Sequence, residues 1–327
     1  MKKALKFFAL FAGLVFGFLL YVQCTYRQTY QAPVTGLRAS TDPAVIARGQ
    51  YLAMGPAHCW TCHVEDPAKV DFRQGPPAMS GGMALELPLM VSLRTPNITP
   101  DKKTGIGRYT DEQLAQTLRY NVTPRGHALI PYMGFNSMSD ADLVAILSYL
   151  RAAKPVEKAI PAHAFTMLGK MLMRFAIKPD LSGSHKAFAA TQPDTTAAYG
   201  KYLAYSVANC NGCHTQRGPT GAFTGKPFAG GNKKEVKPAT FVVPNLTPDP
   251  ATGRIYHWSQ QAFIARFRAG KAYPEEFMPW NAYQHMSDND LKAIYNFLQT
   301  LEPVQNKVET TYVTAAGTEP EPEKANF

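Results

Sequence analysis

The amino-acid sequence predicts an all-α protein in which two similar helical domains follow an N-terminal apolar helix. Three observations support this fold class. A set of motifs occurs twice at a separation near 150 residues, the apolar residues of both copies recur at helical spacing without strand alternation, and residues 7–22 form an uncharged apolar run. The chain has 327 residues, which is enough for two domains that each bury a core.

Residues 1–24 are expected to form a membrane anchor. Three lysines precede the apolar run and would stay on the cytoplasmic side. An uncleaved helix is favoured over a cleaved signal peptide, because the bulky segment 21–24 offers no small-x-small cleavage site. Cys24 is expected to be a boundary residue; lipidation is the alternative, disfavoured by Gln23 before it. Under each of these alternatives the rest of the chain is exported. With the favoured uncleaved helix, the sequence predicts a bacterial inner-membrane protein whose domains lie in the periplasm.

Charge and composition exclude some classes of protein. The chain has 34 basic and 24 acidic residues, a net charge of +10, of which three lysines belong to the N-terminal segment. No basic cluster is interleaved with aromatic residues, so nucleic acid is not an expected partner. Hydrophobic residues make up 45% of the chain and charged residues 18%, which is typical of a folded protein.

The internal repeat predicts the domain boundaries. The matched segments are GQYLA at 49–53 and GKYLA at 200–204, CWTCH at 59–63 and CNGCH at 210–214, PNITPD at 96–101 and PNLTPD at 244–249, and MSDADL at 138–143 and MSDNDL at 286–291. Two long copies in the same order indicate duplication of a whole domain, not a solenoid. The predicted domains are residues 42–152 and 194–304.

Two further segments lie outside the repeat. Residues 153–193 are expected to be an interdomain linker with a short helix near residues 165–175, packed between or across the domains. Docking of this helix on a partner subunit or on the membrane surface is the alternative. Residues 305–327 are polar and rich in proline, which predicts a disordered tail.

Apolar periodicity predicts three helical segments in each domain. They cover residues 42–63, 110–121 and 139–152 in the first copy and residues 194–214, 258–269 and 287–301 in the second. Ser139 and Ser287 are predicted N-caps, and Asp142 and Asp290 stand at the third helical position, where the helix dipole favours a carboxylate. Loops rich in glycine and proline are expected between the helices.

The two Cys-x-x-Cys-His motifs predict covalent attachment of two c-type haems. The thiols of Cys59 and Cys62, and of Cys210 and Cys213, would add to the vinyl groups of a haem. The adjacent His63 and His214 would each coordinate the iron. A zinc site would require four ligands where each motif offers three, and a thioredoxin-like redox pair would require a βαβ context. Structural disulfides are a further alternative.

The second axial ligands are expected to be Met133 and Met278, because no other histidine is matched between the copies. Both methionines stand in loops flanked by proline, glycine and aromatic residues, which suits a loop lying against the far face of a haem. Met138 and Met286 are also matched, but they directly precede the N-cap serines. That position is typical of a hydrophobic staple, so a structural role is expected for them.

Two other features of the repeat are expected to shape the haem pockets. The PNITPD and PNLTPD segments would form a pocket wall, with Asn97 and Asn245 reaching a propionate or a loop carbonyl; a plain turn is the alternative. Trp60 and Trp280 are expected to pack on the haems.

On these motifs the chain resembles the c-type cytochromes, specifically two-domain, membrane-bound proteins similar to the cytochrome c subunits of periplasmic alcohol, aldehyde and gluconate dehydrogenases. The resemblance covers residues 42–304. It implies two tandem cytochrome c-like domains, each a small bundle of helices around a covalently bound haem.

Ligation by histidine and methionine fills both axial positions, which suits one-electron transfer. We therefore expect an electron carrier and not an enzyme, working between a periplasmic dehydrogenase or quinol-oxidising system and a downstream soluble cytochrome or terminal oxidase. A dihaem enzyme such as a cytochrome c peroxidase is the alternative, and a haem-based sensor is a third possibility.

Overall fold

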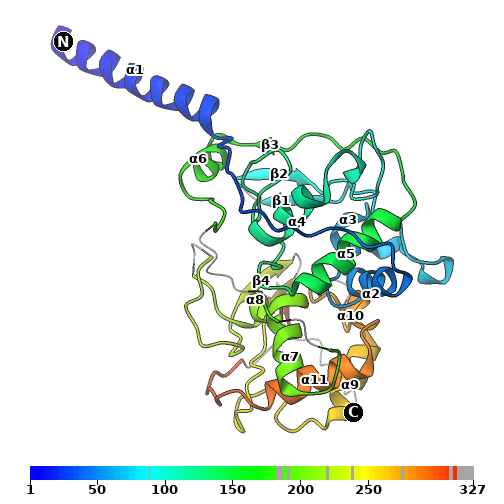
Figure 1. Ribbon diagram of the computed structural model, residues 1–327. Helices are drawn as coiled ribbons and strands as arrows, with labels where there is room; N and C mark the ends of the chain where they lie inside the picture. The colour runs from blue at the N-terminus through cyan, green and yellow to red at the C-terminus, as the bar shows by residue number, and fades with distance from the viewer. Residues whose placement is uncertain are drawn as a thin grey trace. The chain divides into compact units, whose positions relative to one another are not determined.

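The computed structural model describes most of the chain, namely residues 1–87, 89–181, 187–189, 192–218, 221–236, 239–273, 276–308 and 312–314. Its contacts divide the chain into two compact units. Unit 1 comprises Met1–Ile46, Cys62–Asn136 and Leu143–Lys186, and unit 2 comprises Ala47–Thr61, Ser137–Asp142 and Ala187–Phe327. Two segments of the first repeat, residues 47–61 and 137–142, are thus counted with unit 2. We describe each unit by itself (Figure 1).

Unit 1 contains α1, α4, α6 and a small sheet. Its helices are α1 (Lys2–Thr25), part of α2 (Pro43–Met54), α3 (Trp60–His63) except its start, α4 (Asp111–Tyr120), most of α5 (Asp140–Ala152) and α6 (Met167–Phe175). Short 3₁₀ turns are η1 (Pro67–Lys69), η2 (Phe72–Gln74) and η3 (Ile106–Arg108). The strands are β1 (Ala84–Leu87), β2 (Val91–Arg94) and β3 (Ala164–Phe165).

The N-terminal helix α1 confirms the expected apolar element. It has 24 residues and is long and apolar enough to cross a membrane, and as an N-terminal helix it would equally suit a signal sequence. Nearly all of its side chains are exposed, and Val22 is buried.

Helix α4 illustrates how local sequence begins and ends an element in unit 1. Thr110 and Gln113 form a reciprocal capping box at its start, and Asn121 ends it in the left-handed conformation. The carboxylate of Asp111 then pairs with Arg151 at 2.8 Å, so the start of α4 is held against the end of α5.

Unit 2 contains the second repeat. Its helices are the remainder of α2 and α5, α7 (Ala197–Tyr202), a π-helical turn η4 (Leu203–Val207), α8 (Cys210–His214), α9 (Gln260–Ala269), α10 (Trp280–Tyr283) and α11 (Asp288–Leu298). Its strands are β4 (Lys233–Val236), β5 (Ala239–Val242) and β6 (Tyr312–Thr314).

Close packing of α7 on α11 organises unit 2. A Cβ atom at Gly200 would lie 1.9 Å from the carbonyl oxygen of Ala293, so only glycine permits this approach. The predicted N-caps are confirmed, since the hydroxyls of Ser139 and Ser287 accept from the amides of Asp142 and Asp290. Burial of Leu291, Ile294 and Phe297 then gives α11 its inward face.

The expectation of a purely helical chain is wrong in detail, because each unit contains a small antiparallel sheet. The strand order is β1-β2-β3 in unit 1 and β4-β5-β6 in unit 2. These strands lie in segments expected to be loops, and none exceeds four residues, which is too short for alternation to be recognised. β6 lies in the predicted disordered tail, whose residues 309–311 and 315–327 are outside the described part of the chain.

Reciprocal hydrogen bonds join the two repeats within unit 2. The hydroxyl of Tyr51 donates to Asp290 at 2.5 Å, and the hydroxyl of Tyr202 donates to Asp142 at 2.6 Å. These tyrosines are equivalent residues of the GxYLA segments, and the aspartates are equivalent residues of the last helices. Asp142 also receives two bonds from the guanidinium of Arg48, at 2.9 and 3.1 Å.

Candidate haem-binding sites

Each Cys-x-x-Cys-His motif forms a short helix of its own. The expected continuous helices of residues 42–63 and 194–214 are interrupted just before the first cysteine, where His58 and Asn209 adopt left-handed φ values of 40° and 51°. Their carbonyl oxygens accept from the amides of Thr61 and Gly212, three residues further on. The chain therefore turns at equivalent positions in both copies; α8 carries its whole motif, and α3 carries its motif except Cys59.

Both motif histidines are held by the same backbone contact. Nδ1 of His63 lies 3.0 Å from the carbonyl oxygen of Pro96, and Nδ1 of His214 lies 3.1 Å from that of Pro244. A carbonyl only accepts, so Nδ1 carries the proton and Nε2 is left as the coordinating atom. Desolvation lowers the pKa of both rings, to about 4 for His214, so the imidazole is neutral and able to bind iron at physiological pH.

Glycines support these contacts from behind. Gly81 and Gly230 both have φ +73°, and their amides donate to the carbonyls of His63 and His214 at 2.8 Å. A Cβ atom at either position would lie 2.5 Å from the carbonyl carbon of the proline that holds the histidine. The role of the proline carbonyls was not predicted, although Pro96 and Pro244 begin the matched PNITPD and PNLTPD segments.

The asparagines of the PNITPD and PNLTPD segments bind loop carbonyls, as one of the two expectations had it. Nδ2 of Asn97 donates to the carbonyl of Val156 at 2.8 Å, and Nδ2 of Asn245 donates to that of Val304 at 2.8 Å. Their Oδ1 atoms accept from the amide and hydroxyl of the threonine two residues on. Both segments are thereby locked as walls behind the histidines.

The motif cysteines, all of them described in the structure, form no disulfide with one another. All five cysteines of the chain are free thiols in the structure. Among the described residues, no group of three or more His, Cys, Asp or Glu side chains could hold a metal ion. Desolvation raises the pKa of Cys210 to about 12 and also raises that of Cys213, which does not favour the reactive thiolate of a thioredoxin-like pair.

The matched methionines differ in burial. Met138 and Met286 are buried, with 0% and 2% of their surface exposed, as a structural role requires. Met133 and Met278 are half-buried in irregular segments that precede α5 and α10. The assignment of Met133 and Met278 as axial ligands stays a prediction.

An unpaired buried donor in unit 2 fits an anionic group. Nε1 of Trp280 is buried, and no acceptor for it is found within the described part of the chain. The guanidinium of Arg266 lies 3.8 Å from the centre of the Trp280 ring, and burial lowers the pKa of both Arg254 and Arg266. Arg266 pairs with Glu276 at 3.3 Å, and a haem propionate would supply the acceptor that Nε1 of Trp280 lacks. Trp60 differs, since its Nε1 donates to the carbonyl of Met54 at 2.9 Å.

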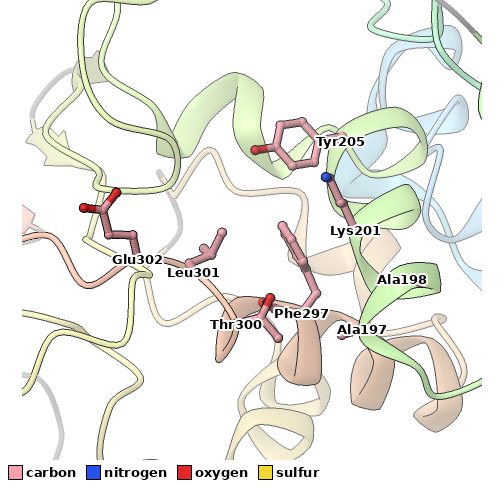
Figure 2. A pocket seen from close by; sticks show the side chains of 8 residues that line it. All are labelled: Ala197, Ala198, Lys201, Tyr205, Phe297, Thr300, Leu301 and Glu302. Atoms are coloured by element: carbon pink, nitrogen blue, oxygen red, sulfur yellow. The ribbon is translucent and has the colours of Figure 1, made fainter.

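A shallow pocket on unit 2 is separate from these groups. Figure 2 shows its lining, which includes Lys201 of α7, Tyr205 of η4 and Phe297 of α11, together with Leu301 and Glu302 just after α11. The Tyr205 ring packs on Phe297 with ring centres 5.9 Å apart. The lining contains no cysteine, histidine or methionine, so the pocket does not hold the predicted haem ligands.

The fold and these sites define the class of the protein. It is a mainly helical chain in which residues 197–302 match the cytochrome c family, and the motif residues fit covalently bound haem c.

The relatives narrow this class further. The chain is 29% identical to the fructose dehydrogenase cytochrome subunit of Gluconobacter japonicus over 82% of its own length and 55% of that protein. It is 30% identical to the gluconate 2-dehydrogenase cytochrome c subunit of Pantoea cypripedii over 80% and 60%. It is 26% identical to a dihaem c-type cytochrome of Cereibacter sphaeroides over 76% and 83%.

The chain is therefore a homologue of the cytochrome c subunits of fructose, gluconate and alcohol dehydrogenases and of a dihaem cytochrome c. These homologues are electron carriers. The chain spans about 55 to 62% of the length of the dehydrogenase subunits that it matches.

Proposed function

We propose that the protein is a dihaem c-type cytochrome that transfers single electrons from a periplasmic dehydrogenase or quinol-oxidising system to a downstream soluble cytochrome or terminal oxidase. In this proposal α1 is retained as an anchor in the bacterial inner membrane, and the haem domains lie in the periplasm. The dehydrogenase partner is supported by the names of the relatives, which are subunits of such enzymes.

The observation that carries the proposal is that the two sites are copies in geometry as well as in sequence. The histidine-to-proline contacts differ by 0.1 Å, and the supporting glycines share a φ of +73°. A single functional haem would leave one of these arrangements without a purpose. Two equivalent sites are what a chain with two similar redox centres requires.

Each residue has a defined task in the proposal. Cys59 and Cys62, or Cys210 and Cys213, hold one haem covalently, and the adjacent histidine and Met133 or Met278 bind its iron. The bound haem supplies the Fe(III)/Fe(II) couple. The proline carbonyl fixes the histidine ring and raises its basicity, while the methionine fills the position that a substrate would need.

Substitution of the methionines tests this assignment. We expect Met133→Leu and Met278→Leu each to convert one haem per chain to the high-spin state, because leucine fills the volume of methionine without a sulfur ligand. Met138→Leu and Met286→Leu are the matched controls and should leave both haems low-spin, since these buried residues are predicted to be structural. The measurement is the electronic absorption spectrum with haem quantified per chain; two haems are expected.

The same spectra distinguish the enzyme alternative. A haem that is high-spin in the unaltered protein, or one that reacts with hydrogen peroxide, would support a peroxidase and contradict an electron carrier. Unchanged spectra after both leucine substitutions at positions 133 and 278 would show that the axial ligands are other residues.

A further inference from the structure

Helix α6 of unit 1 presents an apolar stripe to the solvent. Leu168, Met171, Leu172 and Phe175 follow the i, i+3, i+4, i+7 spacing of one helix face. Leu168 and Phe175 are 48% and 50% exposed, and the two residues between them are partly exposed. A soluble surface helix would carry polar groups on this face. Burial of this exposed stripe in an apolar environment outside unit 1 would therefore be favourable.

The opposite face of α6 is fixed to unit 1. Gly169 packs on the carbonyl oxygen of Met90, which would lie 2.0 Å from a Cβ atom at that position. The hydroxyl of the N-cap Thr166 also donates to the carbonyl of Leu89, and Met173 is buried. The orientation of α6 is thus set by the fold, and the stripe cannot rotate inward.

The flanks of α6 bind the C-terminal end of α1. Lys170 donates to Oε1 of Gln23 at 2.7 Å, and Arg174 donates to the hydroxyl of Tyr21 at 2.6 Å. The guanidinium of Arg174 also lies 5.4 Å from the centre of the Tyr21 ring. Tyrosines and long cationic side chains are the residues that favour the boundary between lipid and water. Figure 1 shows α6 beside this end of α1.

One contact reaches deeper along α1. The Phe175 ring stacks on that of Phe18 with centres 6.2 Å apart and an angle of 7° between the planes. Phe18 lies seven residues before the end of α1, which is about 10 Å along the helix axis. If α1 crosses the bilayer, Phe175 must therefore reach the apolar layer, and the stripe of α6 is continuous with the apolar surface of α1.

From this geometry we infer that α6 is an interfacial helix. Its apolar stripe inserts into the periplasmic phospholipid leaflet of the membrane that α1 spans. Lys170 and Arg174 stay at the headgroup level, where they suit anionic phosphates. Unit 1 then has two attachments to the membrane, a spanning helix and a helix lying in the interface. The inference rests on the retained anchor of the proposed function.

Photoactivatable lipids test the position of α6. The full chain is placed alone in phosphatidylcholine and phosphatidylglycerol nanodiscs that contain a phospholipid with a diazirine near the start of its acyl chain. Mass spectrometry then maps the lipid adducts after illumination. We expect adducts on α1 and on α6, at least tenfold more frequent than at Val34, an apolar residue of unit 1 that is 83% exposed.

A double variant sharpens the test. Leu168→Lys with Phe175→Lys places two cations in the stripe and should lower the adducts on α6 at least fivefold while those on α1 stay unchanged. Val34→Lys is the matched control and should change neither. Adducts on α1 with only background labelling of α6 would overturn the inference and would point to a partner protein as the occupant of the stripe.

The intact mass of the purified chain separates the two proposals. A mass lacking residues 1–24 would overturn the retained anchor. In that case the processed protein is mixed with vesicles of the same lipids: adducts on α6 would still support an interfacial helix, and their absence would overturn it.

Discussion

At the scale of single residues, the orientation of each motif histidine depends on a backbone carbonyl that is itself positioned by a glycine. Gly81 touches the carbonyl of Pro96 closely enough that any side chain would displace it. The orientation of a predicted iron ligand is thus controlled by a residue that lies outside the Cys-x-x-Cys-His motif. The effect of this close approach can be separated from the strain of a left-handed backbone, because Gly36 has nearly the same φ as Gly81 but open space where its Cβ atom would lie.

We expect Gly81→Ala to cost more stability than Gly36→Ala. Gly36 has φ +71° with nothing within 4 Å of a Cβ atom, whereas Gly81 has φ +73° and atoms of Thr95 and Pro96 at 2.5 Å. The left-handed conformation costs alanine about 1–2 kcal/mol at both positions. Displacement of the Pro96 backbone should add about 1–3 kcal/mol at Gly81 alone. The free energy of unfolding from denaturant titration measures both.

The same pair of variants reports on the histidine. If the contact from Nδ1 of His63 to Pro96 weakens in Gly81→Ala, the imidazole becomes a poorer donor, so Fe(III) is less stabilised and the reduction potential of that haem rises. Gly36→Ala should leave both potentials unchanged. Equal behaviour of the two variants in stability and in potential would mean that the close approach does not position the carbonyl.

At the scale of elements, the hydrogen bonds from Tyr51 to Asp290 and from Tyr202 to Asp142 join equivalent residues of the two repeats, but the two aspartates differ in their cationic partners. Asp142 accepts from Tyr202 and forms an ion pair with Arg48, whereas Asp290 accepts from Tyr51 without a cation bound to it in the described structure. Desolvation raises the pKa of Asp290. The ionised form of Asp290 is thus disfavoured by folding.

We therefore expect opposite tolerance of the two aspartates to asparagine. Asp142→Asn leaves the largely buried guanidinium of Arg48 without its counter-charge and should lower the free energy of unfolding by about 2–4 kcal/mol. Asp290→Asn keeps an acceptor for Tyr51 and removes a buried charge, so its effect should stay within about 1 kcal/mol.

The pH dependence gives a second measurement on the same variants. A carboxyl with a raised pKa makes the native state hold its proton longer than the unfolded chain, so stability falls as pH rises from 3.8, the ordinary value for Asp290, through the raised pKa. Asp290→Asn should remove this fall. Equal losses of stability in Asp142→Asn and Asp290→Asn at neutral pH would contradict the assignment of charge balance.

The elements show how far sequence reasoning reaches. Helices with a cap and a periodic apolar face were predicted close to their observed bounds, as Ser287 and α11 illustrate. The small sheets were missed because their strands are too short to show alternation, and because β3 and β6 pair with segments far away in the chain, as between Val91 and Phe165. The hydrogen bond between Tyr51 and Asp290 could not be predicted either, because these residues are 239 positions apart in the chain.

In the candidate sites, too, features that are local in the sequence were predicted and contacts between distant residues were not. The motif cysteines and histidines are contiguous, so their spacing alone predicted the chemistry. The contact between His63 and the carbonyl of Pro96 joins residues 33 positions apart and involves no side-chain atom of proline. Pro96 belongs to a repeated segment, but only the three-dimensional structure shows that its carbonyl oxygen contacts the histidine.

At the scale of the whole molecule, the two sites differ in their surrounding charge. Arg266 of unit 2 corresponds by position to Thr117 of the first repeat and pairs with Glu276 at 3.3 Å, whereas Arg254 precedes Ile255, the equivalent of Ile106. His214 is also buried, with 6% of its surface exposed, whereas His63 is only half-buried. A drier environment favours the less positive Fe(II) state, and the additional cation Arg254 would act in the same direction.

We therefore expect the second haem to have the higher reduction potential, so that electrons pass from the first site to the second. A redox titration should resolve two transitions. Met278→Leu should abolish the upper one and Met133→Leu the lower one, because loss of the sulfur ligand shifts the potential of the affected haem downward. Arg266→Gln should lower only the upper transition, and Lys103→Gln, at a side chain that is 74% exposed, should move neither. Loss of the upper transition in Met133→Leu would reverse the order of electron flow.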